Sequence, residues 1–183
     1  RYVMAIHAKG IAGRGGRIFL SADGLSWAPL SSDLLIEHTN DILSLHWDLI
    51  REQYIAIVNH WVERLGRIPH QSVSKDLINW EPKRPVITPS LAPIETYASR
   101  LNGGKTQFYG MSGIVSRGDL LIGLVKVLQD DLNATPGKTA AEMGDPDRKA
   151  AGIGYTVLAW SRDGRTWQRD HEPFIPRNEF PGT

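Results

Sequence analysis

The sequence predicts an all-β fold of the β-propeller type, built of four-stranded antiparallel blades, of which these 183 residues hold an incomplete set. Three observations predict it. A seven-residue motif that ends in tryptophan occurs at Ser21–Trp27, Ser74–Trp80 and Ser161–Trp167. A short apolar run rich in β-branched and aromatic residues, typical of a buried strand, precedes each copy. The first two copies lie 53 residues apart, near the roughly 40 to 50 residues of a propeller blade.

The motif itself predicts a tight turn between the third and fourth strands of a blade. Its serine and aspartate can accept hydrogen bonds from backbone amides of the turn, and Gly24 and Gly164 supply a positive φ at low cost. Leu77 replaces glycine in the second copy, so we expect that turn to differ slightly. We assign the motif aspartates to turn capping: Asp23, Asp76 and Asp163. The tryptophan then begins the next strand and offers a large apolar surface to a neighbouring sheet.

Each strand can be placed relative to a motif. The first blade takes residues 1–35 and has no first strand, because its apolar run, Tyr2–Ile6, corresponds to the second strand of the other blades. The second blade takes residues 36–90, with strands at Ile42–Trp47, Gln53–Asn59, Arg67–Ser74 and after Trp80. The third takes residues 91–175, with strands at Phe108–Val115, Leu120–Leu128 and Tyr155–Arg162. Residues 176–183 begin a further blade, and since propellers have four or more blades, we expect the chain to be a fragment.

Two insertions distinguish the third blade from the second. The second and third motifs lie 87 residues apart, and the excess falls in Ser90–Gln107 and Gln129–Ala151. In an up-and-down blade these stretches leave from the same end of the sheets, which we call the loop end, whereas the motifs lie at the opposite, turn end. Insertions gathered on one face of a repeat protein often mark its binding side. The sequence therefore predicts a site at the loop end.

The composition of the chain limits the classes of partner that we expect. The formal net charge of +1 gives no electrostatic reason to expect nucleic acid or a membrane surface as a partner. No run approaches the ~20 apolar residues of a membrane helix. The chain has no cysteine, and its six histidines show no zinc spacing, so we expect no metal. Any signal peptide would precede Arg1, which leaves a secreted or periplasmic location open. The sequence does not indicate an oligomeric state.

One stretch resembles a known family. Asn40–Asp48 followed by Gln53–Ile57 is similar to a blade of the five-bladed glycoside hydrolases of families 32, 43 and 62, and of the related family 130 mannoside phosphorylases. The resemblance implies a five-bladed propeller, an oligo- or polysaccharide substrate, no organic cofactor, and three carboxylates from successive blades that face the axis. It places Asp41 where the family has the aspartate that stabilises the transition state. The first-blade aspartate would precede Arg1.

The third carboxylate departs from the family pattern. Gly110 stands where the resemblance places the glutamic acid that protonates the leaving group. Glycosidases need one ionised and one protonated carboxyl group beside the bond, and loss of general acid catalysis costs about 10² to 10⁴ in rate. Glu95, on the preceding loop, is the candidate to substitute for the missing acid.

Substrate-binding candidates come from the same blades. Aromatic faces suit the apolar face of a sugar ring, and Asn40 and His46 belong to the stretch that carries the resemblance. The aromatic candidates are Trp47, Trp61, Tyr97 and Tyr109. Blade packing by these aromatics, and capping of a strand by Asp41, are the structural alternatives. Arg17 and Arg67 both stand near the beginning of a third strand, which favours a shared structural role for them.

Three functions stay open on the sequence alone. The first is a glycoside hydrolase with carboxylates facing the axis. The second is a glycan-binding propeller without catalysis, suggested by Gly110. The third is a sialidase-like six-bladed propeller, which the sequence favours least because no arginine triad is apparent.

Overall fold

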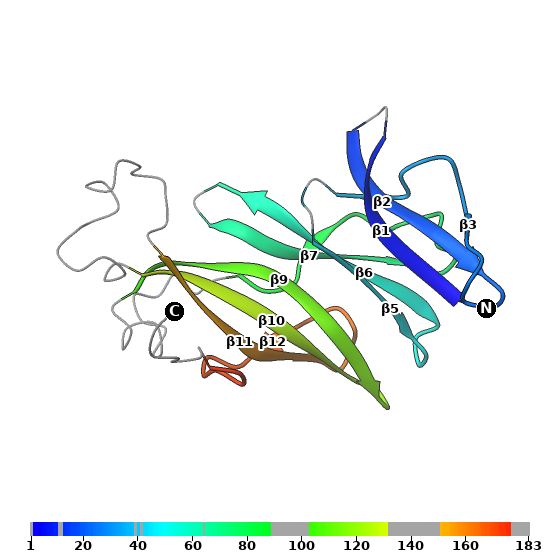
Figure 1. The fold of residues 1–183 in the computed structure, drawn as a ribbon. Coiled ribbons are helices and arrows are strands. Elements are labelled where there is room, and N and C mark those ends of the chain that lie inside the picture. The colour runs from blue at the N-terminus through cyan, green and yellow to red at the C-terminus, as the bar shows by residue number, and fades with distance from the viewer. Residues whose placement is uncertain are drawn as a thin grey trace.

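A computed structural model of the chain describes residues 2–10, 13–38, 40, 42–63, 65–88, 103–131 and 151–176, with only the backbone described for 103–107, 128–131 and 151–153. Every regular element among them is a strand, and the strands form three four-stranded antiparallel sheets (Figure 1). The all-β architecture expected from the sequence is confirmed.

The first sheet contains β1 (Tyr2–Gly10), β2 (Gly13–Ser21), β3 (Ala28–Pro29) and β4 (Ile36–Glu37). The second contains β5 (Leu43–Asp48), β6 (Gln53–Val62), β7 (Gly66–Ser74) and β8 (Arg84–Pro85). The third contains β9 (Gly103–Arg117), β10 (Leu120–Asp131), β11 (Ala151–Ser161) and β12 (Gln168–Arg169). In the second and third sheets the strands follow one another in chain order, whereas β3 and β4 both pair with β2.

The three sheets share one register. The serine that opens each motif pairs with the strand before it, as Tyr2 with Ser21, Tyr54 with Ser74 and Leu121 with Ser161. By this register β1 corresponds to β6 and β10. Each of those two strands also pairs along its other edge, β6 with β5 and β10 with β9, and we call β5 and β9 the inner strands. β1 has no partner on that side among the described residues.

The motif turns are built in the same way. In each, the serine hydroxyl accepts a hydrogen bond from the residue three positions on, as from the amide of Gly24 to Ser21 Oγ at 2.8 Å. The aspartate Oδ1 accepts two further amides, as from Leu25 and Ser26 to Asp23 at 2.8 Å each. These bonds, first that from the amide three residues on, hold the pKa of all three aspartates below the ordinary 3.8. The assignment of these aspartates to turn capping is confirmed.

We expected the second turn to differ slightly from the other two, but it has the same geometry. Leu77 adopts a φ of 70°, close to the 80° of Gly24 and the 69° of Gly164, and its amide bonds Ser74 Oγ as the glycines bond theirs. A left-handed conformation costs a leucine about 1 kcal/mol or more. Its side chain is only 5% exposed and packs in the core between the first two sheets, and this burial offsets the cost.

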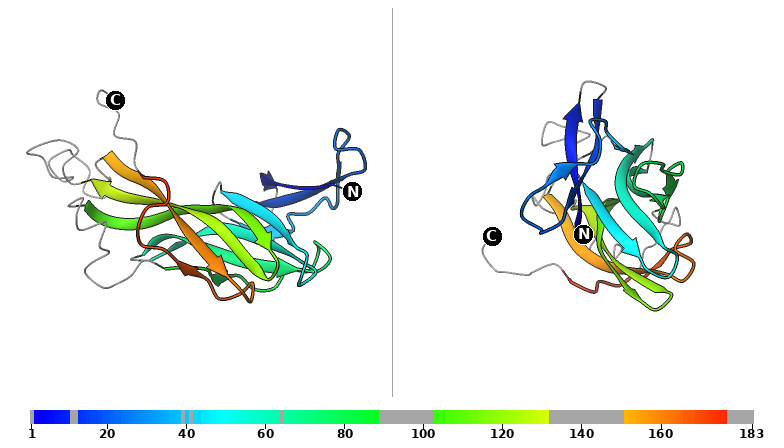
Figure 2. Two further views of the ribbon diagram at one scale, coloured as in Figure 1. Left: turned by 90° about the horizontal axis from the view of Figure 1, so that it is seen from below. Right: turned by 90° about the vertical axis from the view of Figure 1, so that its right-hand side faces the viewer.

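Two apolar cores join the sheets. One lies between the second and third sheets and includes Ile55, Ile57, Phe108 and Met111. The other joins the first and second sheets and includes Ala56 and Val58. Strand β6 supplies both cores with alternate residues, which explains why its sequence is apolar without interruption from Tyr54 to Val58. Figure 2 shows the first sheet standing beside the second.

The first insertion ends, and the second insertion begins and ends, at the same end of the third sheet. Asp131, the last residue of β10, pairs with Gly103 and with Ala151. The strands are longer than predicted here: β9 begins five residues before Phe108, and β10 and β11 extend into the stretch assigned to the second insertion. The prediction that both insertions leave from one end is confirmed for the residues that flank them.

Candidate functional site

Toward the loop end, side-chain amides link the segment before β5 to β6, and β6 to the middle of β9. The Nδ2 of Asn40 donates to the backbone oxygen of Asn59 at 3.0 Å, and the Nδ2 of Asn59 donates to the backbone oxygen of Tyr109. Asn59 is 1% exposed, and its Oδ1 has no hydrogen-bond partner among the described residues. A buried amide that bridges two sheets helps to fix their relative position, because moving the sheets apart would leave the buried donor and acceptor unpaired, which is costly.

Tyr109 sits on a β-bulge. Lys126 pairs with Gly110 and Val127 pairs with Phe108, so Tyr109 is an extra residue in β9. Bulges occur next to active sites because they redirect a side chain. The Tyr109 ring contacts two cations: the Cζ of Arg67, 4.6 Å from the ring centroid, and the Nζ of Lys126, 5.2 Å from it. Such contacts are worth about 0.5–1 kcal/mol each at exposed sites.

Trp61 belongs to the same region. It pairs with Arg67 across β6 and β7, so the two side chains project from the same face of the second sheet. Trp61 is 58% exposed. Of the residues predicted from the sequence, Asn40, Trp61 and Tyr109 therefore gather at the loop end, together with Asn59, Arg67 and Lys126, which sequence reasoning did not select.

The interpretation of Arg67 as the counterpart of Arg17 is wrong. Arg17 pairs with Ile6, and the corresponding pair of the second sheet is Val58 with His70. Arg17 donates to the backbone oxygen of Ser32, whereas Arg67 lies over Tyr109 of another sheet. Counting back from the motif serines, rather than forward from the strand starts, would have separated the two arginines.

Gly110 marks a close approach of the two inner strands. A Cβ placed on this residue would lie 2.9 Å from Cγ2 of Ile42, closer than real Cβ contacts come. Gly110 is buried. The position where the resemblance expects the acid therefore has no room for a carboxyl side chain unless Ile42 moves.

His46 and Trp47 lie nearer the turn end. The His46 Nε2 is 2.7 Å from Ser116 Oγ, one residue before the end of β9, and burial lowers the pKa of His46. Trp47 packs against Tyr54 with ring centroids 4.6 Å apart, and both line a groove beside Tyr2 of the first sheet. These contacts do not bring either residue to Tyr109, and their contact with a sugar stays a prediction.

Other predicted residues lie outside the described part of the chain: Asp41, Glu95 and Tyr97. The described residues include no group of three or more histidine, aspartate or glutamate side chains able to hold a metal ion. They also include no helix long and apolar enough to cross a membrane.

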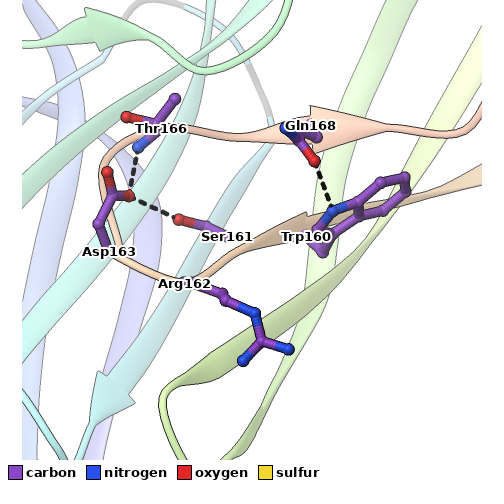
Figure 3. Close-up of a pocket in the computed structure, with 6 residues that line it drawn as sticks. All are labelled: Trp160, Ser161, Arg162, Asp163, Thr166 and Gln168. Atoms are coloured by element: carbon purple, nitrogen blue, oxygen red, sulfur yellow. Dashed lines mark hydrogen bonds between the residues drawn. The ribbon is translucent and has the colours of Figure 1, made fainter.

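A hollow of about 340 Å³ lies at the turn end, beside the third motif. Figure 3 shows that its polar side chains bond one another. Asp163 accepts from Ser161 and from the amide of Thr166, and Trp160 donates to Gln168. These groups serve the turn, so the hollow is a poor candidate for a binding site.

No family model and no curated protein matches the chain. Several solved structures, in contrast, are similar to the chain. An N-acetylgalactosamine deacetylase from F. plautii, in complex with blood group B trisaccharide, is 14% identical, with a TM-score of 0.56 over 90% of this chain and 46% of that one. Sucrose-6-phosphate hydrolase from Lactobacillus gasseri is 13% identical, with a TM-score of 0.52 over 92% and 30%. Penicillium chrysogenum α-L-arabinanase with arabinobiose is 12% identical, with a TM-score of 0.52 over 91% and 44%.

The chain thus spans half or less of the length of these solved proteins. At this level of identity the similarity shows the fold alone. Together with the three antiparallel four-stranded sheets, it shows that the described part of the chain has the architecture of a β-propeller.

Proposed function

We propose that this chain belongs to a carbohydrate-active protein that binds its sugar at the loop end and hydrolyses a glycosidic bond there. The observation that carries the proposal is the amide bridge from Asn40 through Asn59 to Tyr109, which joins the second and third sheets on the side nearer the loop end. The names of the three solved proteins and their bound ligands include a carbohydrate in each case, which supports a sugar as the ligand class.

In this proposal the chain supplies two of the three carboxylates that the chemistry needs, and the third would act as nucleophile or as the base that activates water. Asp41, which follows the anchored Asn40, stabilises the positive charge that develops on the sugar ring, and Glu95 protonates the leaving oxygen. Asn40 and Trp61 contact the sugar. Tyr97 offers a second aromatic face on the insertion that precedes β9.

One observation favours a second function, a glycan-binding propeller without catalysis. Gly110 occupies the place of the acid, and Ile42 fills the space that a side chain there would need. A protein that lacks this acid can still bind sugar through its amides and aromatic rings.

A panel of aryl glycosides and oligosaccharides separates the two functions. We expect the protein to release the aryl group from at least one glycoside, measured by absorbance, and to bind the matching oligosaccharide, measured by calorimetry. Binding without turnover across the panel would favour the second function. Absence of both binding and turnover would contradict a carbohydrate site.

A further inference from the structure

We propose that the ligand of the loop end is a glycan that carries an anionic group. Lys126 of β10 and Arg67 of β7, which both contact the Tyr109 ring, would recognise that group. The shared chemistry is a negatively charged oxyanion, such as a uronate carboxylate, a sulfate ester or a phosphate ester. This inference rests on the proposed carbohydrate site and names the class of its substrate.

The geometry places two positive charges against one ring. Arg67 comes from β7 of the second sheet and Lys126 from β10 of the third, and the bulged Tyr109 lies in contact with both. Cation–π contacts hold positive charge at the face of this ring, and an anion close to that charge gains Coulomb energy.

Lys126 also differs from four cations that pair with carboxylates on the protein. Lys83, Arg84, Arg162 and Arg165 each pair with a carboxylate on the protein at 2.7–3.1 Å. Lys126 is exposed and makes no ion pair with any described residue. Its exposed ammonium group lies five residues before Asp131, where β10 ends and the second insertion begins.

The contacts change the role expected for Tyr109. A ring that faces Arg67 at 4.6 Å offers less of its surface to a sugar, so Tyr109 orients the cation instead. The guanidinium fork suits planar oxyanions, and the ammonium group acts as a point charge that accepts any of them. Trp61, on the same face as Arg67, leaves an aromatic surface for the sugar ring.

The test compares matched neutral and acidic sugars. Calorimetry would measure the Kd of the protein for galactose and glucose oligosaccharides, for the uronic acid oligomers of the same linkage, and for their 6-sulfated and 6-phosphorylated forms. We expect at least about tenfold tighter binding of one acidic form, which corresponds to about 1.4 kcal/mol. That preference should weaken as salt is raised.

Variants of Lys126 test whether this side chain causes the preference for acidic sugars. Lys126→Gln should remove most of the preference for the acidic form, and Lys126→Arg should retain it. Lys75→Gln is the matched control, because Lys75 is an exposed lysine at the turn end. Lys126 is exposed, so its variants should fold normally.

Two results overturn the inference in distinguishable ways. If neutral sugars bind as tightly as acidic ones and Lys126→Gln changes neither, the acidic preference is wrong and the carbohydrate site stands. If no sugar of either kind binds, the carbohydrate site itself is wrong, and the inference falls with it.

Discussion

Hydrolysis is expected to fall at least about a hundredfold when Asp41 is replaced by asparagine. The substitution keeps the size of the side chain and removes the negative charge that would stabilise the transition state. The expected readout is kcat on the best glycoside of the panel. The melting temperature should stay nearly unchanged, because asparagine retains the capacity to accept a hydrogen bond at a strand entry.

Asp23→Asn is the matched control for this experiment. Asp23 caps a turn at the opposite end of the sheets, and asparagine can accept the same backbone amides. We expect this variant to keep its activity. Equal activity of the Asp41→Asn variant and the unmodified protein would reject the catalytic role of Asp41.

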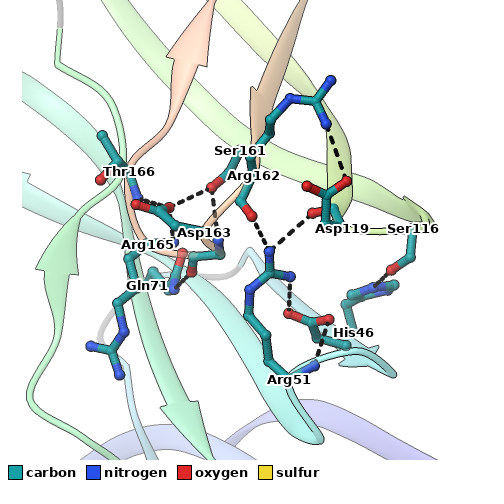
Figure 4. Close-up of polar contacts among 12 residues, drawn as sticks. His46, Arg51, Gln71, Ser116, Asp119, Ser161, Arg162, Asp163, Arg165 and Thr166 are labelled. Atoms are coloured by element: carbon teal, nitrogen blue, oxygen red, sulfur yellow. Dashed lines mark hydrogen bonds and ion pairs between the residues drawn. The ribbon is translucent and has the colours of Figure 1, made fainter.

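Arg51→Met is expected to lower the free energy of unfolding by about 3 to 5 kcal/mol. The Arg51 guanidinium bonds the Asp48 carboxylate at 2.8 Å and donates to the backbone oxygens of Asp119 and Arg162, so it joins the second sheet to two turns of the third (Figure 4). The Asp48 side chain is 0% exposed. Removing its partner would leave a buried charge uncompensated.

Urea denaturation measures this change. The matched control is Arg84→Met, which removes an exposed partner of Glu81 at the same spacing along the chain, and should cost less than about 1 kcal/mol. The double variant Asp48→Asn with Arg51→Met should recover part of the loss, because it removes the buried charge as well. If Arg51→Met lowers the free energy of unfolding no more than Arg84→Met does, the bonds of Arg51 do not hold the second and third sheets together.

The sequence predicted the turn end well because its structure is local. Serine, aspartate and the amides that they bind lie within three residues of one another, so the motif alone specifies the capping. Leu77 shows where local reasoning fails. Its conformation depends on the burial of its side chain by another sheet, and that is not written in the seven residues of the motif.

The loop end was predicted in part. The place of the insertions followed from the repeat spacing, but the contacts of Arg67 and Lys126 with Tyr109 depend on a bulge and on the packing of two sheets. Neither can be derived from one sequence. His46 was grouped with Asn40 because the two are near in sequence, yet β5 carries His46 toward the opposite end, where it meets Ser116.

The position of a bound oligosaccharide tests the central claim most directly. A crystal structure of the protein with the tightest ligand of the panel should show the sugar at the loop end, within contact distance of Trp61 and Lys126. A sugar bound instead at the turn end, against Trp160 and Asp163, would contradict the account.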